Sequence, residues 1–167
     1  MHPCAHYRRE AFSLLLSLPV RVVAIDPGER RTGVALSDAS GVLAFPHATL
    51  RGPSMRGQWD QLVALLTRLT DDEDGLDTIV VGVPVRLDGS PTDMTAQATG
   101  LVERLRRRFD VPVVAVDERL TSIEAEARLS VTERDWRARK DKLDAAAAAV
   151  LLQDYLDTRR EMPSCSD

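Results

Sequence analysis

The stretch VVAIDPGERRTGVALSD, residues 22–38, decides the fold because it contains two strand patterns and the turn between them. Its first four residues form an unbroken apolar run, which predicts a strand buried on both faces of a sheet. The run ends at Asp26, and the Pro-Gly pair that follows turns the backbone. Because the apolar pattern resumes after Gly33, the stretch predicts a hairpin whose first strand carries a carboxylate at its tip.

The position of the Asp26 carboxylate at the end of a buried strand requires an explanation. An unpaired buried carboxylate costs several kcal/mol, so such acids serve as metal ligands, as partners of a base or as turn formers. Asp-Pro-Gly is also good turn chemistry by itself. The choice between these roles depends on whether other acids converge on the same point.

The composition is that of an ordinary globular domain. The 167 residues are enough for one domain with a real core, and the net charge of −4 argues against a general nucleic-acid coat protein while allowing a local basic patch. Cys4 and Cys165 match no metal or redox spacing. A reducing, cytoplasmic location is therefore expected.

The chain is expected to divide into three parts. Residues 1–20 are interpreted as an N-terminal extension, because the apolar run after Arg8 and Arg9 lacks the cleavage site of a signal peptide and is too short to span a bilayer. Residues 21–158 are expected to form a single domain, and residues 159–167 a flexible tail. No membrane partner is expected.

Strand and helix patterns alternate along this domain. Strands are expected at 21–26, 33–37, 42–49, 78–83 and 111–116. Helices are expected to begin near Ser54, after the N-cap Ser90 with Pro91 in the first helical position, at the capping-box pattern 121–124, and near Asp141. This order predicts an α/β fold in which a five-stranded mixed sheet has helices on both faces.

Three acids are predicted to converge at one edge of that sheet. Asp26 and Glu118 end or follow strands whose carboxyl ends share a crevice in open sheets. Asp144 shares a helical stripe with Ala148 and Leu151, which turns it toward the sheet. Three carboxylates in one place repel each other unless a cation lies among them, and Mg²⁺ or Mn²⁺ suits such oxygen ligands.

Each acid also has an ordinary structural explanation. Glu118 would serve equally well as the ion-pair partner of Arg119 or a lysine, and Asp144 as an acid favoured by the dipole of its helix. Asp117 is expected to point to the opposite face from Glu118, and Asp141 to be an N-cap. The metal-site hypothesis depends on the coincidence of all three acids.

Four sequence blocks together resemble the YqgF/RuvX family of Holliday junction resolvases, which has the ribonuclease H-like fold. They are DPGERRTGVA from Asp26, GVPVRLDG from Gly82, DERLTS from Asp117 and KLDAA from Lys142. The resemblance covers about residues 21–157 in the right order. The family more often has Asn at the position of Arg86 and an aromatic or apolar residue at that of Pro27, and it has no counterpart of residues 1–20.

The resemblance implies a metal-dependent nuclease acting in maturation of the 5′ end of small-subunit (pre-16S) ribosomal RNA, on four-way DNA junctions, or on both. Asp26, Glu118 and Asp144 would be the catalytic residues and would hold two Mg²⁺ or Mn²⁺ ions, with Asp26 bridging both. In-line hydrolysis leaving a 5′-phosphate is expected, and the symmetry of a junction leaves a homodimer open.

Basic residues near the acids are candidate contacts to the nucleic-acid backbone. They are Arg30, Arg31, Arg86, Arg119, Arg137, Arg139, Lys140 and Lys142. The segment from about 130 to 142 is expected to be a mobile basic loop, for which a merely solvated loop is the alternative. Two rival functions remain open: a non-catalytic nucleic-acid-binding module with this fold, and an ATP-handling domain that begins with a similar hairpin.

Overall fold

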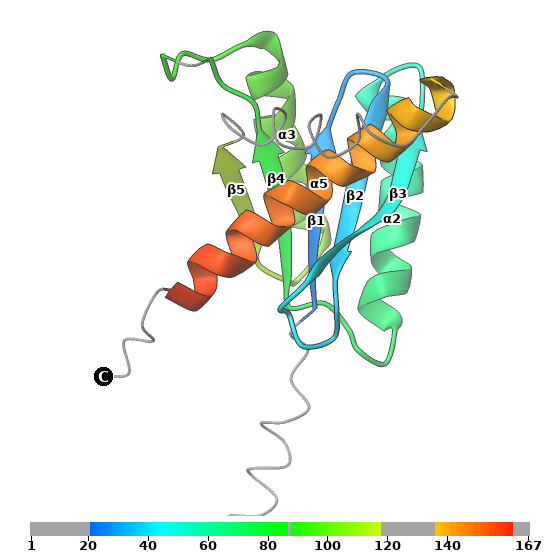
Figure 1. Ribbon diagram of the computed structural model, residues 1–167. Helices are drawn as coiled ribbons and strands as arrows, with labels where there is room; N and C mark the ends of the chain where they lie inside the picture. The colour runs from blue at the N-terminus through cyan, green and yellow to red at the C-terminus, as the bar shows by residue number, and fades with distance from the viewer. Residues whose placement is uncertain (1–20, 87, 118–135, 162–167) are drawn as a thin grey trace, which may run out of the picture.

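A single five-stranded sheet forms the centre of the computed structural model, which describes residues 21–86, 88–117 and 136–161, with only the backbone at residues 55 and 136–142 (Figure 1). Its elements are β1 (Val22–Pro27), β2 (Arg31–Ser37), β3 (Ala44–Arg51), α2 (Met55–Asp71), β4 (Thr78–Val83), α3 (Asp93–Arg108), β5 (Val113–Asp117) and α5 (Trp136–Glu161). The strand order is β3-β2-β1-β4-β5.

The sheet is mixed because its two halves are connected differently. β1, β2 and β3 form an antiparallel meander, whereas β4 and β5 run parallel to β1. The carboxyl ends of β1, β4 and β5 therefore lie at the same edge of the sheet, the edge that also carries the β1–β2 hairpin (Figure 1).

Helices cover both faces, as the sequence predicts. Val23 and Ile25 of β1 pack with α2 and α3, while Val22 and Ala24 pack with α5. This alternation along one strand explains why β1 is apolar throughout, since a strand covered on both faces has no solvent side. α5 crosses β1, β2 and β3 diagonally, and its N-terminal part lies beside the β1–β2 hairpin (Figure 1).

Helix α3 begins two residues later than predicted. Thr92 is its N-cap and forms a reciprocal capping box with Thr95, whose backbone N–H donates to the Thr92 hydroxyl at 3.2 Å. Ser90 instead belongs to the preceding loop, where its N–H donates to Asp88 Oδ1 at 2.9 Å and its carbonyl accepts from Arg86. Pro91 lies in an isolated bridge with Val85, so its backbone is extended rather than helical.

Helix α5 is longer than predicted at both ends. It begins at Trp136 rather than near Asp141, so the expected mobile loop is wrong for residues 136–142, which are helical. The basic residues there have high helix propensity, and neither Gly nor Pro interrupts residues 136–161. The helix also continues past Thr158 to Glu161, two residues before Pro163. The capping-box pattern at 121–124 lies outside the described residues.

Gln153 fixes α5 to the edge strand. Its side-chain amide accepts a hydrogen bond from the N–H of Ala44 at 3.0 Å and donates one to the carbonyl of Val42 at 3.1 Å.

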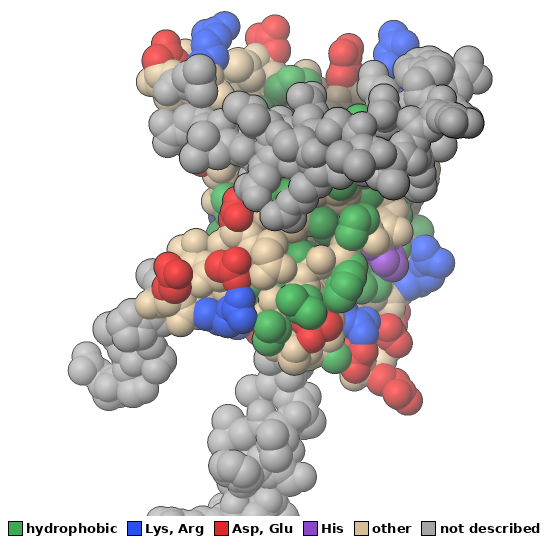
Figure 2. Space-filling view, viewed as in Figure 1, with side chains coloured by type: hydrophobic (Ala, Val, Ile, Leu, Met, Phe, Trp, Pro, Cys, Tyr) green, Lys and Arg blue, Asp and Glu red, His purple; other side chains and the backbone are tan. Residues whose placement is uncertain are grey.

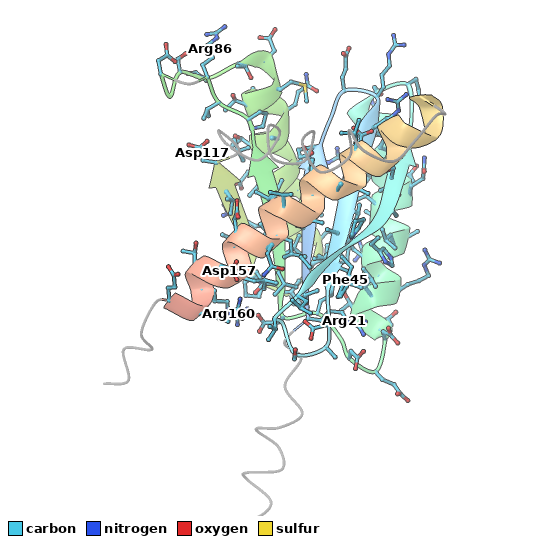
Figure 3. All side chains as sticks on the ribbon, in the orientation of Figure 1. Arg21, Phe45, Arg86, Asp117, Asp157 and Arg160 are labelled. Carbon is cyan, nitrogen blue, oxygen red and sulfur yellow. The ribbon has the colours of Figure 1, made fainter. Side chains whose placement is uncertain are left out.

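Phe45, close to this attachment, is one of the large apolar side chains that are exposed to solvent (Figure 3). Acidic and basic side chains are interspersed over the part of this face drawn in colour in Figure 2. No helix in the described ranges is both long and apolar enough to cross a membrane.

Asp38 organises the turn between β2 and β3. Its carboxylate accepts a hydrogen bond from the Ser40 hydroxyl and, through Oδ1, from the N–H groups of Val42 and Leu43 at 2.8 and 2.9 Å. These bonds, that of Ser40 first, lower the pKa of Asp38 from 3.8 to about 2.

Asp38→Ala is predicted to destabilise the protein by about 1 kcal/mol at pH 7, after allowance for solvent screening of this partly exposed carboxylate. Because the folded pKa is depressed, the contribution is complete above pH 4 and is lost as the pH falls toward 2. Urea unfolding of both proteins between pH 7 and 2.5 measures the difference, with Ser40→Ala as a milder variant. A gap that is unchanged at pH 2.5 would contradict this account.

Candidate active site at the β1–β2 hairpin

Asp26 lies on the face of the sheet that α5 covers. Successive side chains of a strand alternate between faces, and Val22 and Ala24 of β1 both pack against α5. Asp26 is the next residue on that face, and its side chain is partly exposed at the end of the strand. Directly opposite, in the antiparallel pair, stands Gly33 of β2.

Gly33 brings Asp144 to the same place. A Cβ on Gly33 would meet the carbonyl oxygen of Asp144 at 2.0 Å, so only glycine permits α5 to approach β2 this closely. On α5, Ala148 and Leu151 are buried against the sheet, and the Asp144 side chain, on the same stripe, is 30% exposed. Asp26 and Asp144 therefore both lie next to Gly33 on the α5 face of the sheet.

Arg31 is the ionic partner of Asp144. It lies two residues before Gly33 on β2, and its Nε is 4.0 Å from Asp144 Oδ2. Arg51 of β3 stands directly opposite Arg31, which places a second positive charge beside the first. Bound cations and the helix dipole were the two explanations of Asp144 that the sequence offered; the structure adds a third, the nearby Arg31 guanidinium.

The hairpin loop that carries these residues is fixed by backbone and buried contacts. The Gly28 N–H donates to the Arg31 carbonyl at 2.8 Å, and a Cβ on Gly28 would meet that oxygen at 2.5 Å. Gln58 of α2, which is buried, donates to the Glu29 carbonyl at 3.3 Å and accepts from the Thr32 hydroxyl. The charged groups of the hairpin thus stand on a rigid support.

A hollow of about 270 Å³ opens beside Asp144 and the hairpin. It is lined by Gly28, Glu29, Arg30, Arg31 and Asp144. Arg30 is exposed, whereas Arg31 is partly buried. The hollow is therefore lined by two acidic residues, Glu29 and Asp144, and by two arginines, Arg30 and Arg31.

Several predicted site residues fall where the structure describes little or nothing. Glu118 and Arg119 lie outside the described residues. For Arg137, Arg139, Lys140 and Lys142 the structure describes a helical backbone at the start of α5 and no side chain. Within the described ranges no group of three His, Cys, Asp or Glu side chains is placed to hold a metal ion.

Two other candidates occupy different positions. Asp117 ends β5, and because its neighbour Val116 packs with the α5 core, Asp117 points to the face opposite α5. Its predicted orientation relative to Glu118 stays a prediction, because Glu118 lies outside the described residues. Arg86 is exposed on the β4–α3 loop, where its guanidinium donates to Ser90 Oγ at 3.4 Å and to the Pro91 carbonyl at 3.3 Å (Figure 3). Its contacts stabilise its own loop and do not reach the hairpin.

The donor set at the hairpin fits a divalent cation. Asp26 and Asp144 supply hard carboxylate oxygens on one face, and the adjoining hollow leaves space for the waters that Mg²⁺ retains.

Two features of the site were not predicted from the sequence: the contact of Arg31 with Asp144 and the close approach of α5 that requires glycine at position 33. A glycine on a buried strand facing a helix is the signal for such a close approach, because a strand interior otherwise disfavours glycine.

Comparison with known proteins identifies relatives over most of the chain. The model of the RuvX family, described as "Holliday junction resolvase", matches residues 20–158. A protein of Dechloromonas aromatica named "Putative pre-16S rRNA nuclease" is 39% identical over 137 residues, which are 82% of this chain and 90% of the relative. One of the same name from Roseiflexus is 37% identical, over 86% of this chain and 99% of the relative.

Among solved structures, T. thermophilus RuvC in complex with a Holliday junction substrate superposes with a TM-score of 0.51. The match covers 84% of this chain and 96% of RuvC at 16% sequence identity, and it shows that the two share the ribonuclease H-like fold. The family match, together with relatives of similar length, leads to one conclusion: the chain belongs to the RuvX Holliday junction resolvase family.

Proposed function

We propose that this protein is a divalent-metal-dependent nuclease that hydrolyses phosphodiester bonds in nucleic acid. The observation that carries the proposal is that Asp26 and the Asp144 backbone both lie next to Gly33, on the face of the sheet that α5 covers. The names of the relatives favour precursor ribosomal RNA as the substrate, and the family description adds four-way DNA junctions. We also propose a cytoplasmic location for this activity.

Asp26 and Asp144 would hold the cations, with Glu118 as the third ligand. A bound Mg²⁺ or Mn²⁺ supplies Lewis acidity at the scissile phosphate and a water of lowered pKa. Two ions, with Asp26 touching both, are the arrangement that we propose. Asp26 is suited to this role because it pairs with Gly33 of β2, and the preceding residue, Ile25, is paired with both β2 and β4.

The basic residues around the hollow would bind and orient the substrate. Arg30 and Arg31 line it, and guanidinium groups match phosphate oxygens bidentately. We further assign Arg119, Arg137, Arg139, Lys140 and Lys142 to contacts along the same strand of nucleic acid. Arg86, held in its own loop, would contact the substrate only beyond the cleavage position.

The decisive experiment compares wild type with Asp26→Asn on end-labelled 5′-extended 16S precursor RNA and on a four-way DNA junction. Each substrate is incubated with Mg²⁺, with Mn²⁺ and with a chelator. Cleavage by wild type with metal, leaving 5′-phosphate ends, and none with chelator or with Asp26→Asn, supports the proposal. Which substrate is cut at the lower enzyme concentration decides between RNA and junction DNA.

A binding curve that is unaffected by Mg²⁺ and by Asp26→Asn, with no cleavage of either substrate, would overturn the proposal and favour a non-catalytic binding module. Metal-dependent nucleotide hydrolysis without nuclease activity would instead favour the ATP-handling alternative.

A further inference from the structure

Arg31 occupies a position between a carboxylate that it contacts and a hollow that it lines. Its Nε is 4.0 Å from Asp144 Oδ2, an oxygen that is screened from solvent, and the two side chains are 26% and 30% exposed. A guanidinium group stays charged at every pH of interest. In the metal-free protein, the Asp144 carboxylate thus has a cationic neighbour supplied by the chain itself.

A divalent cation at Asp144 would compete with this contact. The guanidinium and the cation repel each other and prefer the same carboxylate, so each weakens the binding of the other.

We propose that Arg31 is a built-in counter-ion of Asp144 that lowers the metal affinity of the free protein and, when a cation takes the carboxylate, turns to the nucleic-acid backbone. The inference rests on the metal-dependent function proposed above. The released guanidinium stays at the wall of the hollow, beside Arg30, where a phosphate group can accept from it bidentately. Metal and nucleic acid then favour each other's binding reciprocally.

The first test measures Mn²⁺ affinity without nucleic acid, by calorimetry or by the electron paramagnetic resonance signal of free Mn²⁺. Arg31→Gln is expected to bind Mn²⁺ about three- to tenfold more tightly than wild type, because the competing cation is gone. Arg30→Gln removes the same charge from the same hollow without the Asp144 contact, and it is expected to change the affinity less than twofold. Arg31→Lys, which restores a cation, should return the affinity toward that of wild type.

Equal or weaker Mn²⁺ binding by Arg31→Gln, relative to Arg30→Gln, would overturn the inference and leave the nuclease proposal intact. Absence of Mn²⁺ binding in every variant would overturn both. Circular dichroism melting curves establish that the variants being compared are folded.

The second test measures nucleic-acid binding in chelator, where no cleavage takes place. Asp144→Asn removes the carboxylate that Arg31 contacts, and this variant is expected to bind a 5′-extended 16S precursor fragment more tightly than wild type. Adding Arg31→Gln should remove most of that gain, while Arg31→Gln alone should cost little, since Asp144 already engages the guanidinium. Strictly additive effects of the two substitutions would overturn the proposed release.

Discussion

Gly33→Ala should both destabilise the protein and abolish its activity, because the new methyl group has no space. The alanine Cβ would lie 2.0 Å from the Asp144 carbonyl oxygen and 3.2 Å from the Ala145 nitrogen, which are backbone atoms of a packed helix. They cannot rotate away as a side chain can, so α5 must move off β2. We expect a loss of about 3 kcal/mol, within the range of overpacked cores, measured by urea unfolding.

The same displacement moves Asp144 away from Asp26, so nuclease activity should fall even at temperatures where Gly33→Ala is fully folded. Gly100→Ala is the matched control. Gly100 lies inside α3, and a Cβ there would meet nothing within 4 Å, so alanine should stabilise the protein by about 0.5–1 kcal/mol through helix propensity. If Gly33→Ala were as stable as wild type, the close approach of α5 to the hairpin would not be the device that assembles the site.

Local patterns were sufficient to predict the sheet and its layers. Unbroken apolar runs at β1 and β4 require cover on both faces, and β4 spans Thr78–Val83 as predicted. The start of α2 near Ser54 was predicted from the amphipathic pattern that follows this residue. In the structure Ser54 is the N-cap, and its hydroxyl accepts a hydrogen bond from the Gly57 N–H. Such features depend on residues close together in the chain.

The errors occurred where two local signals compete. Both Ser90-Pro91 and Thr92 are suitable residues for the start of a helix. Hydrogen bonds of Ser90 with Asp88 and Arg86 hold Ser90 in the preceding loop, so Thr92 is the N-cap. At the start of α5, basic composition suggested a loop, but residues 136–142 continue the helix whose later residues, from Ala148 on, pack on the sheet. Neither outcome follows from propensity alone.

The candidate site was predictable in part. Asp26 was located by its position at a strand end and Asp144 by its helical stripe, and the structure places both on the α5 face of the sheet. The contact of Arg31 with Asp144 was not predictable, because it depends on the diagonal path of α5 across β2. Spacing within one element fixes which face a residue occupies, whereas the partner on that face is set by how the elements cross.

Asp144→Asn is expected to reduce cleavage by about a thousandfold or more with little change in stability. Losing one carboxylate ligand removes transition-state stabilisation worth several kcal/mol, at 1.36 kcal/mol for each factor of ten. The amide is nearly isosteric, and it leaves the Gly33 contact untouched because that contact is made by the Asp144 backbone. Single-turnover cleavage at saturating Mn²⁺ measures the loss of activity, and urea unfolding of the same samples measures the change in stability.

Asp154→Asn supplies the control for charge, since Asp154 is exposed on the same helix and its loss changes the net charge equally. We expect it to retain activity within about twofold, as surface substitutions have small effects. If Asp144→Asn also cleaved at nearly the wild-type rate, Asp144 would not be a metal ligand, and its carboxylate would serve only to position Arg31. Raised nucleic-acid affinity with unchanged cleavage would be the signature of that outcome, because the guanidinium would be released while the catalytic groups stayed in place.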